Sequence, residues 1–85
     1  MSRPIFYHIT GENGGDIINL AEATNIYIRK QQANTMSGLY TSFHLMVCFK
    51  NGNETSIHLA INDEVEAQEY LKGMFRYLQS EIARD

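Results

Sequence analysis

The chain has 85 residues and lacks the means for an internal disulfide, because Cys48 is its only cysteine. It also lacks an excess of positive charge: seven Lys and Arg residues against ten Asp and Glu residues give a net charge of −3. That balance opposes non-specific binding to nucleic acid or to an anionic membrane. No apolar run approaches the roughly 20 residues of a membrane span, and the N-terminus has no signal-peptide pattern. We therefore expect a cytoplasmic protein that does not bind membranes.

The length predicts one domain, residues 1–85. A core of this size buries only about 60–65% of the surface that the unfolded chain exposes. Small domains often gain further stability from disulfides, metals or self-association. Since a disulfide is excluded, self-association is the expected source of additional burial.

Alternating apolar and polar residues, bounded by turn residues, predict five strands and one helix. The strands are expected at about 5–10, 16–20, 24–30, 40–49 and 53–61, and the helix at about 63–84. Residues 31–38 are polar and without periodicity, so we expect a mobile connection there. The predicted fold is α+β: a curved antiparallel sheet of four to five strands with one C-terminal helix packed on a face.

The register of the hairpin at 41–61 follows from its side chains. A two-residue Asn51-Gly52 turn would place the two apolar rows on opposite faces of the sheet. A three-residue loop, residues 50–52, instead places Leu45 opposite Ile57. It also gives Gly52 the left-handed conformation that glycine adopts without strain. We therefore predict the three-residue loop.

The predicted helix begins with Asn62 or Asp63 as N-cap. Its apolar face consists of Ala67, Leu71, Met74, Phe75, Leu78 and Ile82. Tyr70, Gly73 and Tyr77 widen this face beyond the arc that one sheet needs. Gly73 is explained either by the close approach of another helix or strand, or by a solvated position that tolerates glycine.

The residues that could carry chemistry form no recognisable site. His44 and His58 are expected to lie opposite each other, but a structural zinc site needs four ligands and no third ligand lies near them. Cys48 has no adjacent base that would activate it as a nucleophile. The acidic residues of the helix are typical of a solvated face, and residues 11–16 are typical of a turn. We therefore expect no enzymatic activity, no cofactor and no bound metal.

Two functions follow from these patterns. The first is a small protein-interaction module that self-associates as a homodimer, with an unknown protein partner. The candidate self-association residues are Tyr70, Gly73, Met74, Tyr77, Met46, His44 and His58. The alternative is a single-stranded nucleic-acid-binding domain that uses tyrosines on the sheet. Its candidate contacts are Tyr27, Arg29, Lys30 and Tyr40.

Overall fold

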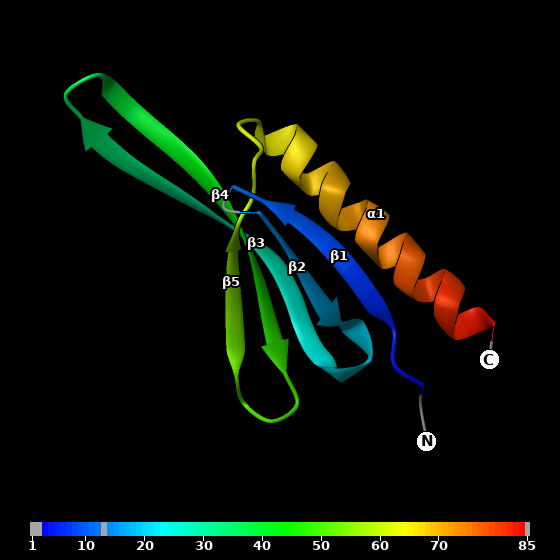
Figure 1. Cartoon of the computed structure of the whole chain (residues 1–85). Helices are drawn as coiled ribbons and strands as arrows, with labels where there is room; N and C mark the ends of the chain where they lie inside the picture. The colour runs from blue at the N-terminus through cyan, green and yellow to red at the C-terminus, as the bar shows by residue number, and fades with distance from the viewer. Residues whose placement is uncertain (1–2, 13, 85) are drawn as a thin grey trace.

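The computed structural model describes residues 3–12 and 14–84 and shows an α+β domain with two antiparallel sheets and one helix (Figure 1). The elements in chain order are β1 (Phe6–Gly11), β2 (Gly14–Asn19), η1 (Leu20–Glu22), β3 (Ala23–Thr35), β4 (Gly38–Phe49), β5 (Glu54–His58) and α1 (Glu64–Ala83). β1 pairs with β2, and β4 lies between β3 and β5. The predicted α+β class is thus confirmed, but the strands form two sheets instead of one.

The split between the sheets originates at Asn19, where the chain leaves β2 and enters the 3₁₀ turn η1. Its side-chain Oδ1 accepts hydrogen bonds from the backbone N–H of Ile5 (2.9 Å) and of Ala21 (3.2 Å). Leu20 N–H donates to the carbonyl of Ile5 at 2.7 Å. These bonds turn the chain away, so β2 and β3 are not paired as neighbours in one sheet.

Among the described residues, one isolated bridge joins the two sheets. It pairs Gly11 with Leu59, and the backbone N–H of Glu12 donates to the carbonyl of His58 at 2.8 Å. A Cβ on Gly11 would lie 3.0 Å from that same carbonyl oxygen. Glycine therefore permits the close approach of the two sheets at this point.

The predicted register of the β4–β5 hairpin is confirmed. Leu45 lies opposite Ile57 and His44 lies opposite His58. Phe49 N–H donates to the carbonyl of Asn53 at 2.8 Å, which leaves residues 50–52 as the loop. Gly52 has a φ of 90°, the left-handed conformation that the three-residue loop requires.

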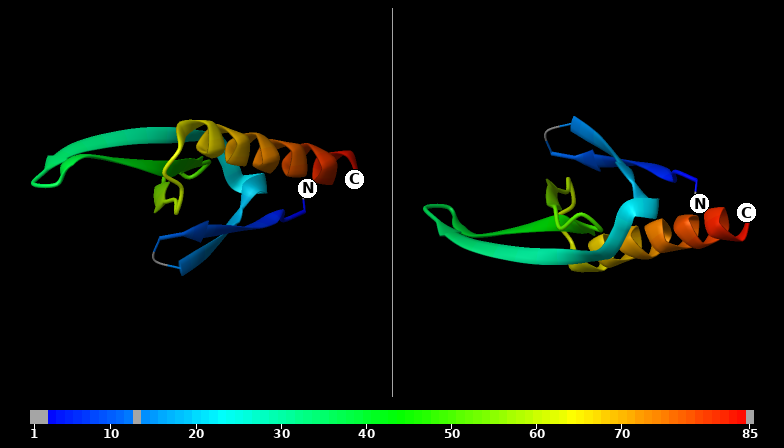
Figure 2. Two further views of the ribbon diagram at one scale, coloured as in Figure 1. Left: turned by 90° about the horizontal axis from the view of Figure 1, so that it is seen from above. Right: turned by 90° about the horizontal axis from the view of Figure 1, so that it is seen from below.

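The core lies between β1–β2 on one side and the three-stranded sheet with α1 on the other (Figure 2). Its buried side chains are Ile5, Ile9, Ile18, Leu20, Ile26, Leu45, Val47, Ile57, Leu59 and Met74. Those that lie in strands occupy alternate positions, such as Leu45 and Val47 of β4, as the period of two predicts. The helix lies beside β3 and β1, and its Tyr77 hydroxyl donates to the carbonyl of Phe6 at 3.3 Å. The predicted apolar face of the helix is only partly buried, since Phe75 and Ile82 are exposed.

The longest departure from the sequence prediction is in β3 and β4, which continue through residues 31–38. Thr35 pairs with Gly38, and the chain reverses at Met36 and Ser37. The Thr35 hydroxyl donates to the Gly38 carbonyl at 2.8 Å and accepts from Ser37 N–H at 3.2 Å. The expected mobile connection is therefore wrong: this segment forms a paired hairpin with a bonded turn.

We call residues 31–42 the arm. It projects beyond the end of β5, away from the helix and the first hairpin (Figures 1 and 2). The molecule measures 51 × 25 × 20 Å, and its radius of gyration of 14.3 Å exceeds the about 12 Å expected for a compact domain of this length. The arm accounts for this elongation.

Candidate interaction surface

One edge of β4 is open along the arm. The N–H of Leu59 donates to the carbonyl of Phe43 at 2.9 Å, so the backbone groups of Phe43 point towards β5. In a strand, backbone groups point to the same side at every second residue. The N–H and C=O groups of Thr41 and Leu39 therefore point to this side as well. No strand of the described chain lies beside them there, because β5 ends at His58, opposite His44.

The outer edge of β3 also has no partner strand among the described residues, but it differs in charge. By the same geometry its outward backbone groups belong to Ile26, Ile28, Lys30, Gln32 and Asn34. Lys30 is in the middle of this series, and its ammonium group forms an ion pair with Glu64 of α1 at 3.5 Å. A lysine on an edge strand discourages pairing with another strand, so this edge is protected where the β4 edge is not.

The arm itself carries no charge. No Asp, Glu, Lys or Arg occurs from residue 31 to residue 49. Apolar side chains nevertheless reach solvent on the arm: Met36 at its tip is fully exposed, Leu39 is 62% exposed and Tyr40 is 47% exposed. Stable monomers protect a long edge with charges, prolines or a covering element. Uncharged open edges with exposed apolar side chains are typical of a surface that another chain covers.

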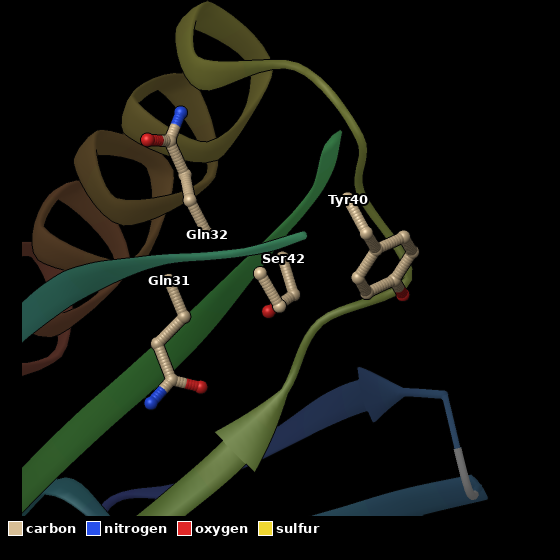
Figure 3. Close-up of a pocket in the computed structure, with 5 residues that line it drawn as sticks. Gln31, Gln32, Tyr40 and Ser42 are labelled. Atoms are coloured by element: carbon tan, nitrogen blue, oxygen red, sulfur yellow. The ribbon is translucent and has the colours of Figure 1, made fainter. Parts of the chain in front are cut away.

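A shallow hollow of about 350 Å³ lies on the arm (Figure 3). Its lining residues are Gln31, Gln32, Ala33, Tyr40 and Ser42. Gln31 and Gln32 point to opposite sides of β3, as neighbouring strand residues do (Figure 3). This lining offers amides and hydroxyls for hydrogen bonding but no carboxylate, imidazole, thiol or amine.

His44 and His58 are stacked on the sheet face that points away from the core. Their ring centroids are 4.8 Å apart, with an angle of 26° between the planes. Ser42 Oγ lies 3.2 Å from His44 Nε2, and Arg29 is opposite His44 on β3. Burial, followed by the positive charges of His58 and Arg29, lowers the pKa of His44 below 6.5.

The other candidate chemical groups of the described chain do not assemble into a reactive centre. Residues 3–12 and 14–84 contain no group of three or more His, Cys, Asp or Glu side chains placed to hold a metal ion. Cys48 of β4 is half-buried, and its thiol donates to Glu54 at 3.1 Å. That hydrogen bond, with some desolvation, raises the pKa of Cys48 and so disfavours the reactive thiolate.

The candidate self-association residues lie in two separate places. Met74 is buried in the core, with 0% of its surface exposed, whereas Met46, with 3% exposed, lies on the face of the sheet that carries His44. Tyr77 packs against Tyr7 of β1, with ring centroids 5.1 Å apart, and Tyr70 lies near Tyr7 and Thr10 of the same strand. The histidines are on the opposite side of the sheet. The structure therefore does not bring the helix residues and the histidines together.

Gly73 has open space around it. A Cβ added at this position would have no heavy atom within 4 Å apart from its chain neighbours and the backbone of its own helix. Among the described residues, no other helix or strand approaches Gly73 closely enough to require glycine there.

Three of the four candidate nucleic-acid contacts share one face of the sheet. Tyr27, Arg29 and Tyr40 lie on the face that carries His44, because Tyr27 is opposite Met46 and Tyr40 is opposite Ala33 in the same alternation. Lys30 lies on the other face and pairs with Glu64. Arg29 is thus the basic side chain of β3 that shares this face with the two tyrosines.

The open β4 edge at Leu39 and Thr41 was missed by sequence reasoning. The signal that could have found it is the long run without charge, which crosses a polar segment where solvated loops usually carry charge. Comparison with models of protein families, with curated proteins and with solved structures gives no match for this chain. No helix of the described residues is long and apolar enough to cross a membrane.

Proposed function

We propose that this protein is a non-enzymatic protein-interaction module that acts as a homodimer and uses the arm as its interface. The observation that carries this proposal is the open, uncharged β4 edge beside exposed Leu39 and Tyr40. Strand addition at such an edge supplies backbone hydrogen bonds for affinity and side-chain contacts for specificity.

The accessible surface of the chain supports the same proposal. It measures 5773 Å², whereas a compact monomer of 9.7 kDa exposes about 5,100 Å². The excess of roughly 650 Å² approaches the about 800 Å² that each partner buries in a standard interface.

The test is the mass in solution, measured by light scattering coupled to size-exclusion chromatography over a hundredfold range of protein concentration. We expect twice the mass of the chain at high concentration, with dissociation on dilution. A mass of one chain throughout would contradict the proposal.

A second candidate function is the binding of single-stranded nucleic acid at the face shared by Tyr27, Arg29 and Tyr40. Six residue positions separate Tyr27 from Ala33, the partner of Tyr40, or roughly 20 Å at about 3.3 Å per residue. That span fits several stacked bases with Arg29 near their phosphates. Binding that weakens steeply as salt rises would support this function. Absent or salt-independent binding would remove it.

A further inference from the structure

We infer that two copies join through the open edges of their β4 strands, antiparallel, with Tyr40 of one copy directly opposite Tyr40 of the other at a twofold axis. This inference rests on the proposed homodimer and specifies the edge, the direction and the register. It starts from the backbone groups that have no partner strand, those of Leu39 and Thr41.

The twofold axis restricts the pairing to a few registers. When such an edge pairs with the same edge of a second copy, residues whose backbone N–H and C=O groups point outward must lie opposite residues of the same kind. With Tyr40 on the axis, Leu39 lies opposite Thr41 of the partner copy, and Thr41 lies opposite Leu39 of the partner copy. In each of these two pairs, each residue donates its N–H to the C=O of the other, so all the open backbone groups of both residues are satisfied.

The neighbouring registers conflict with bonds already present. With Thr41 on the axis, Leu39 would lie opposite Phe43, whose carbonyl already accepts from Leu59 at 2.9 Å. With Leu39 on the axis, Thr41 would lie opposite Ser37, which belongs to the turn and whose N–H donates to Thr35 Oγ1 at 3.2 Å. The register centred on Tyr40 avoids both conflicts.

The open segment has the same limits in both copies. Leu59 occupies the edge at Phe43, and the chain turns at Ser37, so residues 38–42 are available in each strand. When two such segments are antiparallel and centred on Tyr40, each covers the whole of the other. This self-complementarity is what a closed dimer requires.

The side chains of this register favour pairing. The two Tyr40 rings lie at a non-hydrogen-bonded position, where Cα atoms are about 4.5 Å apart and aromatic pairs contribute favourably. No Asp, Glu, Lys or Arg is present from residue 31 to residue 49, so two acidic copies meet without repulsion between their arms at neutral pH. Pairing of two β3 edges about their midpoint would instead bring Lys30 against Lys30.

Cross-linking tests the register directly. In a Cys48→Ser background, Tyr40→Cys places two thiols opposite each other at a distance that a disulfide can span. Ala33→Cys in the same background is the matched control, because Ala33 is opposite Tyr40 within the arm but lies on β3. We expect mild oxidation to convert most Tyr40→Cys protein to covalent dimer, and little of the control. Equal cross-linking of the two variants, or none of Tyr40→Cys, overturns the register.

Proline substitution tests the edge. Thr41→Pro removes an outward N–H of β4, and Gln32→Pro removes an outward N–H of β3 in the same arm, so each leaves the bonds between β3 and β4 in place. We expect Thr41→Pro to weaken dimerisation at least tenfold and Gln32→Pro to leave it unchanged, with circular dichroism to confirm folding of both.

The remaining outcomes separate the inference from the proposed function. If both proline variants remain dimers, the β4 edge is wrong while the homodimer stands. If both become monomers, the assignment to β4 alone is wrong. If the unmodified chain is a monomer at every concentration, the homodimer and the inference fail together.

Discussion

The imidazoles of His44 and His58 are stacked across β4 and β5, with ring centroids 4.8 Å apart. Burial, His58 and Arg29 lower the pKa of His44 below 6.5, so the folded chain takes up this proton less readily than the unfolded chain does. At a pH well above 6.5, His44 is neutral in both the folded and the unfolded chain, so it does not affect the free energy of unfolding. As pH falls through about 6.5, the unfolded state is protonated first and stability is lost.

We therefore expect His44 to titrate by NMR with a midpoint below its ordinary value, and to contribute a loss of stability as pH falls from about 7 to about 5. His58→Gln removes one positive neighbour, so the midpoint of His44 should move back towards the ordinary value. His8→Gln is the control, since His8 lies on β1 in the other sheet. A midpoint at or above the ordinary value in the unmodified chain would contradict this prediction.

Replacement of Asn19 by alanine is expected to destabilise the fold. Its side-chain oxygen accepts from Ile5 N–H and Ala21 N–H, both partly buried, and alanine leaves these donors without that acceptor. The expected loss is about 1–3 kcal/mol in the free energy of unfolding, measured by urea denaturation. Asn25→Ala, at an exposed position of β3, is the control. Equal losses in the two variants would show that Asn19 does not hold the corner.

The N-terminus of α1 gives a third prediction. The sequence left Asn62 and Asp63 as alternative N-caps, and the structure assigns Asp63, whose carboxylate accepts from Glu66 N–H at 3.1 Å. Asp63→Ala is expected to cost about 0.5–2 kcal/mol of stability. Asn62→Ala should change it by less than Asp63→Ala does, in the same denaturation experiment. A larger effect at Asn62 would reassign the cap.

Gly73 gives a fourth prediction, with a stabilising sign. Open space surrounds the position, so Gly73→Ala adds a methyl group without a clash and removes the cost of glycine inside a helix. We expect a gain of about 0.5–1 kcal/mol in the free energy of unfolding and no change in the mass in solution. Gly52→Ala is the contrasting variant, since its φ of 90° strains any other residue. A loss of the dimer in Gly73→Ala would move the interface to the helix.

The parts of the fold that the sequence predicted are those where one face is buried. The row of Phe43, Leu45 and Val47 alternates cleanly, and together with the loop it defined the register of β4 and β5 correctly. The arm was missed for the opposite reason. Residues 31–38 are exposed on both faces of the arm, so burial imposes no alternation of apolar and polar side chains on them.

The two-sheet arrangement was missed because it depends on single contacts between side chain and backbone. The alternation of apolar and polar residues is the same whether the strands form one sheet or two sheets. It also cannot reveal that Asn19 Oδ1 accepts a hydrogen bond from Ile5 N–H. The self-association candidates included residues of the helix and residues of the sheet, and the structure places Met74 and the histidines on different sides of the sheet. Periodicity assigned each residue to a face of its own element but could not orient the elements relative to one another.

The order of strand pairing has a consequence for how the chain reaches this structure. Each ladder joins strands that follow one another in sequence: β1 with β2, β3 with β4, and β4 with β5. Each hairpin therefore closes only a short loop, which costs little chain entropy and allows rapid formation. The bridge between Gly11 and Leu59 closes a much longer loop. We expect the first hairpin to dock last, and to be the first unit to open in native-state hydrogen exchange.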